Sequence, residues 1–271
     1  MHLPGRIGWG LALVVFLADH AARRGPTAVA APAAELTVGL SLENRPIVCQ
    51  VWGEGPDATL VIATIHGNEA AGTPLVAELG RWLDAHPEEL AGRQVVVMPL
   101  ANPDGFARQT RGNAAGVDVN RNFPAGNWTP AAGGGQPAGV HGPAPLSEPE
   151  SRALVRVLCT FYPARVISIH QPLACVDFDG PAEGVAAAMA AACGLPLRQL
   201  GSRPGSLGSF VGVTLQRAIV TLELPRDAGD DGAALWDAYG GALQAALRFR
   251  EASPGVDSDA EKPAANAPQP R

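Results

Sequence analysis

The sequence predicts one α/β domain, with a mixed sheet covered by helices on both faces. Four strand-like runs rich in Val and Ile recur along the chain, at Leu60–Ile65, Val95–Leu100, Arg165–Ile169 and Ala218–Leu222. These runs are almost continuously apolar, which is typical of strands buried on both faces. Helical patterns alternate with them, as expected for an α/β fold. Of the 271 residues, 46% are hydrophobic and 17% are charged, so the chain can bury the core that such a fold requires.

The other elements follow from local patterns along the chain. Residues Leu36–Val51 are expected to form an antiparallel hairpin that turns near Asn44-Arg45-Pro46. Ser147-Glu-Pro-Glu150 is interpreted as a capping box that opens a helix. A further helix is expected at 75–83, where apolar residues have helical spacing. The Ala-rich segment Pro181–Cys193, which ends at Gly194, and the segment Ala233–Arg248 are expected to be helices as well.

Both ends of the chain are expected to lie outside the folded domain, which would span residues 35–250. In residues 1–34, Arg6, the short apolar run Ile7–Ala18 and Ala28-Val29-Ala30 are together typical of a secretory signal peptide. Charged residues between the run and the small-residue site leave a misassigned start or an uncleaved anchor as alternatives. A working signal would make the protein periplasmic or secreted, without a stable membrane span after its removal; otherwise the protein would be cytoplasmic. Residues 251–271 are expected to be a disordered tail, because they contain almost no large aliphatic side chains.

Charge and cysteine content exclude several classes of protein. Lys and Arg number 20 against 26 Asp and Glu, which gives a formal net charge of −6 at pH 7. No basic excess is available to neutralise phosphates, so nucleic acid is not an expected partner. The four cysteines show no C-x-x-C spacing and predict neither a disulfide scaffold nor a thiolate zinc site. Pairing of Cys175 with Cys193 is left open.

Potential metal ligands follow two of the apolar runs. His66 and Glu69 form a His-x-x-Glu motif directly after the first run, and His170 follows the third. Ligands of open α/β sheets bind at the carboxyl ends of the strands. Two imidazoles and one carboxylate, with a fourth position open, are typical of a catalytic zinc site. His-x-x-Glu alone is more often structural, so the hypothesis depends on the residues that accompany it.

One such residue is Glu223, at the end of the fourth run. A carboxylate among apolar residues costs free energy unless it is paired or used. A buried salt bridge is one interpretation. Beside a zinc-activated water, the same group would act as a general base.

A second accompanying feature is the polar segment Arg111–Phe123, which is rich in Arg and Asn. Guanidinium groups bind carboxylates through two hydrogen bonds and stabilise developing oxyanions. The alternative is a polar loop that is fastened by its own side chains. Asp118 and Asn122 are assigned to that structural part.

In this order, the motifs resemble those of the zinc carboxypeptidase family of the carboxypeptidase A type. The likeness runs from about Gly39 to Leu247 and rests on His66-x-x-Glu69, Asn102-Pro-Asp-Gly105, Gly116-Val-Asp-Val-Asn-Arg-Asn-Phe123, Ser147-Glu-Pro-Glu150, Ser168-Ile-His170 and Glu223. The resemblance implies an eight-stranded sheet with mostly parallel inner strands. It also implies one zinc ion bound by His66, Glu69 and His170.

The resemblance also implies a promoted-water hydrolysis of an amide beside a free carboxylate. Glu223 matches the family's general base, and Arg111 matches the residue that polarises the scissile carbonyl. Asn120 and Arg121 match the pair that binds the terminal carboxylate of the substrate.

Departures from the family pattern bear on specificity. The mobile Tyr of the digestive enzymes has no counterpart, since the only tyrosines are Tyr162 and Tyr239. The family's pocket-floor residue falls near Leu207-Gly208, where the sequence has no charged residue, so selection of basic or large aromatic C-terminal residues is not supported. The short length and the segments Pro204–Phe210 and His170–Asp179 are similar to the bacterial murein peptide amidase branch, which cuts the γ-D-glutamyl–diaminopimelate amide.

That branch implies a cell-wall peptide as the substrate. Asp177 or Asp179 would bind its distal amine and Arg203 its distal carboxylate; an ordinary solvated loop is the alternative. Other functions left open are a metallocarboxypeptidase on ordinary C-terminal peptides, an N-acyl amino acid deacylase and an inactive peptidoglycan-binding module. Retention of three metal ligands and Glu223 argues against the last, because a pure binding module needs no buried base.

Overall fold

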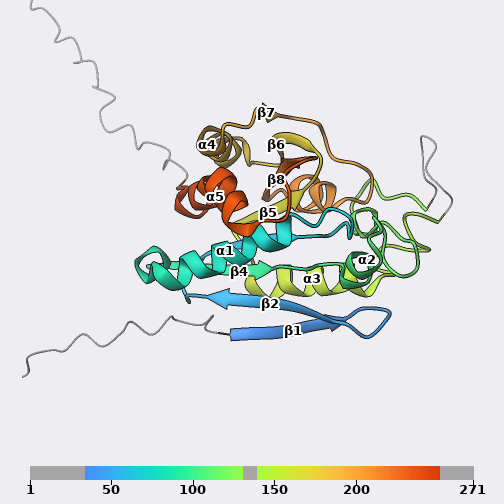
Figure 1. The fold of residues 1–271 in the computed structure, drawn as a ribbon. Coiled ribbons are helices and arrows are strands. Elements are labelled where there is room, and N and C mark those ends of the chain that lie inside the picture. The colour runs from blue at the N-terminus through green and yellow to red at the C-terminus, as the bar shows by residue number, and fades with distance from the viewer. Residues whose placement is uncertain (1–33, 131–138, 251–271) are drawn as a thin grey trace, which may run out of the picture.

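The computed structural model describes residues 34–130 and 139–250 (Figure 1). The predicted signal segment, except for its last residue, and the predicted tail at 251–271 lie outside the described residues. Within the described ranges, no helix is long and apolar enough to cross a membrane.

One mixed sheet of eight strands forms the centre of the domain, as the sequence predicts. The strands are β1 (Ala34–Leu40), β2 (Pro46–Trp52), β3 (Asp57–Ala63), β4 (Arg93–Met98), β5 (Arg165–His170), β6 (Leu173–Asp179), β7 (Leu197–Arg198) and β8 (Ala218–Pro225). Their order is β1-β2-β4-β3-β5-β8-β6-β7. The inner strands β4, β3, β5 and β8 are parallel. The hairpin β1–β2 and strand β6 join them in antiparallel fashion.

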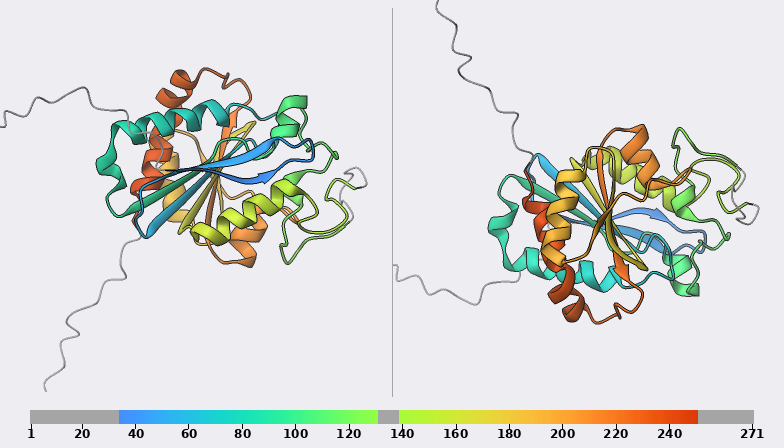
Figure 2. Two further views of the ribbon diagram at one scale, coloured as in Figure 1. Left: turned by 90° about the horizontal axis from the view of Figure 1, so that it is seen from below. Right: turned by 90° about the horizontal axis from the view of Figure 1, so that it is seen from above.

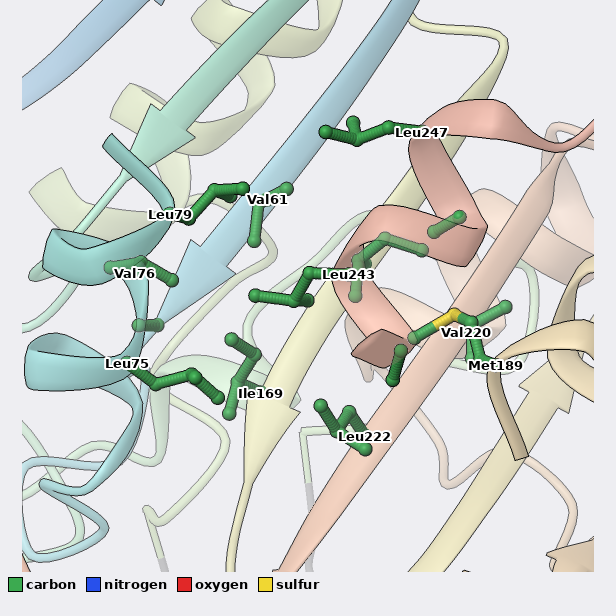
Figure 3. Close-up of a cluster of buried hydrophobic side chains, with 14 of the residues drawn as sticks. Val61, Leu75, Val76, Leu79, Ile169, Met189, Val220, Leu222, Leu243 and Leu247 are labelled. Atoms are coloured by element: carbon green, nitrogen blue, oxygen red, sulfur yellow. The ribbon is translucent and has the colours of Figure 1, made fainter. Parts of the chain in front are cut away.

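Helices cover both faces of the sheet (Figure 2). They are α1 (Gly72–Ala85), α2 (Pro103–Arg108), α3 (Pro149–Phe161), α4 (Glu183–Cys193) and α5 (Gly232–Arg248), with short turns η1 (Pro87–Leu90), η2 (Val119–Arg121) and η3 (Ser209–Thr214). Helices α1, α4 and α5 pack on one face through a large apolar cluster. Figure 3 shows part of this cluster, with Leu75, Val76 and Leu79 of α1 and Leu243 and Leu247 of α5 beside Val61, Ile169, Val220 and Leu222 of the strands.

The opposite face is covered by α3 and the π-helical turn η3. Leu154 and Val157 of α3 and Phe210 and Val211 of η3 are buried there. Phe123 is fully buried and stacks on Phe210, with ring centroids 6.2 Å apart. This contact fixes the end of the Arg111–Phe123 segment against the sheet.

Two local expectations from the sequence were wrong or incomplete. The capping box was misplaced: Glu148 is the N-cap of α3 and no side-chain cap bond is present, while the Ser147 hydroxyl donates to the Glu148 carboxylate. The cause is Pro149, which occupies the first position of the helix and so makes the preceding residue the cap. Strand β6 was not predicted as a strand, although it carries Asp177 and Asp179. Cys175 and Cys193 are both free thiols.

The arrangement of the parallel strands brings the predicted site residues together. Strands β3, β5 and β8 are neighbours and run in the same direction, so their carboxyl ends meet at one edge of the sheet. His66 follows β3, His170 ends β5, and Glu223 lies directly opposite His170 on β8.

Candidate active site

The three predicted metal ligands converge on one point. The Nδ1 atoms of His66 and His170 are 3.1 Å apart. The Glu69 carboxylate lies 2.9 Å from His66 Nδ1 through Oε1 and 2.9 Å from His170 Nδ1 through Oε2. All three residues are buried, and together they form a group whose potential ligand atoms lie within 4.8 Å of one another.

The spacing between His66 and Glu69 is set by a tight turn. Gly67 lies between them, and a Cβ added to it would be 1.9 Å from the carbonyl carbon of Gly105 in α2. Only glycine allows this close approach of two backbones. A larger residue would push the turn away from α2 and move both ligands.

The outward-facing ring nitrogens of the two histidines are bound by other side chains. His66 Nε2 is 3.1 Å from Asp118 Oδ1, and His170 Nε2 is 3.0 Å from Ser168 Oγ. A carboxylate can only accept, so His66 carries its Nε2 hydrogen toward Asp118 and turns Nδ1 toward Glu69 and His170. Such outer hydrogen bonds orient histidines that bind metals. Two imidazole nitrogens and a carboxylate aimed at one buried point fit a zinc ion.

Burial and hydrogen bonding act in opposite directions on Glu69. Burial raises its pKa, but the contacts of its carboxylate with His170 and His66 outweigh burial and hold the pKa well below the ordinary value. Glu69 is therefore ionised, as a metal ligand must be.

Asp118 has a larger part in this site than the sequence analysis assigned to it. It does fasten its own loop, because its side chain accepts from the backbone N–H of Asn120 at 2.9 Å. It also holds His66, and its second oxygen accepts from Arg111 Nε at 3.0 Å. Its position in the polar segment, seven residues after Arg111, was the only sequence signal for this role.

Replacement of Asp118 by Asn is expected to weaken zinc binding about 10- to 100-fold, because the carboxylate that orients His66 becomes a neutral amide. The measurement is zinc competition against a chromogenic chelator. Asp231→Asn is the matched control, since Asp231 caps the distant helix α5 and Asn is an equally good cap. An unchanged zinc affinity in Asp118→Asn would contradict the prediction.

A cavity of about 290 Å³ opens beside the metal-ligand group. All the other predicted site residues line it: Arg111, Asn120, Arg121, Asp177, Arg203 and Glu223. Burial raises the pKa of Glu223, and its Oε2 accepts a long hydrogen bond of 3.4 Å from Leu173 N. Among the described residues Glu223 forms no ion pair, so nothing in this part of the chain supports the salt-bridge interpretation.

The guanidinium groups give the cavity an electropositive wall. Arg111 donates to Glu69 Oε1 at 3.0 Å and so lies next to the metal ligands. Burial lowers the pKa of Arg121, and the nearby cations Arg111 and Arg203 lower it further, against the effect of Asp118. The Asn120 side-chain oxygen accepts from Leu207 N at 2.8 Å, which leaves its NH₂ group available as a donor. An anionic group in this cavity would therefore meet several donors.

Two carboxylates from β6 lie in the same cavity. Asp177 accepts from Leu200 N at 2.8 Å. Asp179 lies against Gly208, where an added Cβ would come within 2.3 Å of its Oδ2. The sequence has no charged residue at Leu207-Gly208 itself, but β6 brings the Asp179 carboxylate beside it from elsewhere in the chain. Burial and the neighbouring Asp177 raise the pKa of Asp179.

Comparisons with known proteins agree with this geometry. Residues 28–173 match the zinc carboxypeptidase family. Murein peptide amidase A of Escherichia coli (strain K12) is 35% identical over 208 residues, which cover 71% of this chain and 82% of that protein. The protein of the same name from Vibrio campbellii is 32% identical over 183 residues, covering 63% and 71%.

Solved structures give the same result for the fold. The crystal structure of murein-tripeptide amidase from Escherichia coli O157 superposes with a TM-score of 0.64 at 28% identity, over 83% of this chain and 95% of that one. Bovine thrombin-activatable fibrinolysis inhibitor superposes with a TM-score of 0.66 at 18% identity, over 79% and 88%, which supports the fold alone.

Proposed function

The chain belongs to the zinc carboxypeptidase family, and from this membership we propose that it is a murein peptide amidase that cuts the amide between γ-linked D-glutamate and diaminopimelate. One observation carries the proposal: the cavity beside the metal ligands combines guanidinium groups with two carboxylates, Asp177 and Asp179. Diaminopimelate has carboxylates at both ends and an amine at its far end. Arg121 would bind the carboxylate beside the cut, Arg203 the distal carboxylate, and Asp177 or Asp179 the distal amine.

The roles of the catalytic residues follow from their positions. His66, Glu69 and His170 would hold one zinc ion, which supplies a Lewis acid that polarises the carbonyl and acidifies a water molecule. The Glu223 carboxylate takes a proton from the attacking water and delivers it to the leaving amine nitrogen. Burial raises the pKa of Glu223 toward the neutral pH range. A carboxyl group whose pKa lies nearer the working pH can both accept the proton from water and donate it to the leaving amine. Arg111 donates to the oxygen of the scissile carbonyl as negative charge develops there.

Replacement of Arg121 by Ala is expected to raise KM about 10- to 100-fold with a smaller change in kcat, because a charge-assisted pair is lost in both the bound substrate and the transition state. Steady-state kinetics on L-Ala-γ-D-Glu-diaminopimelate measure this effect. Arg81→Ala on the exposed face of α1 is the control for the loss of one positive charge. If KM stays unchanged for substrates with a free carboxylate beside the cut, the assignment of Arg121 is wrong.

Product analysis tests the proposed function itself. The zinc-loaded protein is incubated with L-Ala-γ-D-Glu-diaminopimelate, and free diaminopimelate is followed by mass spectrometry. Release that stops with a chelator supports the amidase. No release by zinc-loaded protein would overturn the proposed substrate, and parallel assays with C-terminal dipeptides and N-acyl amino acids would then test the two alternative hydrolases.

A further inference from the structure

A second cavity of about 250 Å³ lies next to the first. Both cavities share Glu69, Arg111, Gln171 and Pro172. The first cavity also contains the side chains that, in the proposed function, bind the carboxylates of the amine part of the substrate. An amide bond joins an acyl part to an amine part. Since the first cavity takes the amine part, the neighbouring second cavity is in the position to receive the acyl part.

The second cavity adds two side chains of its own, Asn68 and Arg226. Arg226 directly follows β8, the strand that carries Glu223. The chain is fixed at this point, since the Pro225 carbonyl accepts from Gln171 Nε2 at 3.2 Å and Pro225 pairs with Leu173 of β6. The stem of Arg226 therefore starts from a fixed point beside the catalytic residues.

Arg226 has no hydrogen bond or ion pair with the residues that the structure describes, and it is exposed. The other cation of this cavity, Arg111, is already bound to Glu69 and Asp118. The cavity's one acidic lining residue is Glu69, whose carboxylate is held by both histidines. The unpaired positive charge in this cavity thus belongs to Arg226, and a guanidinium is suited to a planar carboxylate.

We propose that Arg226 binds a carboxylate in the acyl part of the substrate, so that the enzyme selects acyl groups that carry a second acid. This inference rests on the proposed function: in the murein peptide, the group would be the free α-carboxylate of the γ-linked D-glutamate. That carboxylate belongs to the same residue as the scissile carbonyl. Arg226 acts on specificity and takes no part in proton transfer.

A cycle that combines two substrates with two enzymes tests the proposal. The substrates are L-Ala-γ-D-Glu-diaminopimelate and its isoglutamine analogue, in which an amide replaces only the α-carboxylate. The wild-type protein is expected to prefer the acid roughly tenfold in kcat/KM, the size of one charge-assisted hydrogen bond. Arg226→Ala should abolish this preference, mainly through a lower kcat/KM for the acid, and Arg226→Glu should reverse it. Arg81→Ala, which removes a charge far from both cavities, should keep the preference.

A binding measurement separates failure of this inference from failure of the proposed function. Calorimetry compares L-Ala-D-Glu with L-Ala-D-isoglutamine, which keeps the γ-carboxyl group, on zinc-loaded wild type and Arg226→Ala. Tighter binding of the acid by wild type alone supports the role of Arg226 even if no murein peptide is cut. Equal binding of both compounds by wild type, or a preference that persists in Arg226→Ala, overturns the inference even if the amidase activity is present.

Discussion

Replacement of Glu223 by Gln is expected to lower kcat about 10²- to 10⁴-fold, the contribution of a positioned general acid–base group. The amide has the same shape as the carboxylate but cannot take a proton from water. Glu223 lies opposite His170 on the neighbouring strand and lines the cavity beside the metal ligands. Because the substitution alters this one side chain without changing its shape, the other contacts with the substrate are expected to stay the same. Burial already raises the pKa of the carboxyl, and a neutral side chain there should be tolerated.

Zinc content and thermal unfolding are measured on the same preparation, because a loss of metal would also abolish turnover. Both are expected to match the wild-type protein, since Glu223 is not among the grouped ligand residues. Glu78→Gln on α1 is the control for the same chemical change at an exposed ion pair. Wild-type activity in Glu223→Gln would mean that another group accepts the proton. A separate result, in which neither protein turned over substrate, would favour the inactive-module alternative.

The fold was predictable because its inner strands are buried on both faces. Such strands appear in the sequence as unbroken apolar runs, and all four predicted runs correspond to the parallel strands β3, β4, β5 and β8. The polar residue at the end of a parallel strand then lies at a known edge of the sheet. This rule is sufficient to bring His66, His170 and Glu223 together.

The missed features depend on contacts between distant parts of the chain. Strand β6 alternates buried apolar residues with Asp177 and Asp179, and nothing in its own sequence indicates that it pairs with β8. Its Asp179 supplies a charge beside Gly208, which local inspection of Leu207-Gly208 could not detect. Asp118 likewise appears locally as a cap, and only the folded chain brings its oxygens to His66 and Arg111.

Replacement of His170 by Ala is expected to remove bound zinc and reduce hydrolysis to the background level. Two ligands would remain of the three, and the loss would leave Glu69 Oε2 without one of its partners. Atomic emission should find about one zinc per chain in the wild type and almost none in the variant. His86→Ala is the control, because His86 ends α1 and stacks on Trp82 away from the cavity.

Thermal unfolding gives this prediction a readout that does not depend on activity. A metal that binds only the folded chain raises the unfolding temperature as its concentration rises. Added zinc should therefore stabilise wild type and His86→Ala but not His170→Ala, and a chelator should bring the wild-type unfolding temperature down toward that of the variant. A His170→Ala protein that keeps one zinc and its stabilisation would show that the ion binds through other residues. The convergence of His66, Glu69 and His170 would then be a hydrogen-bonded cluster, and the roles of Glu223 and Arg226 would have to be sought at a different centre.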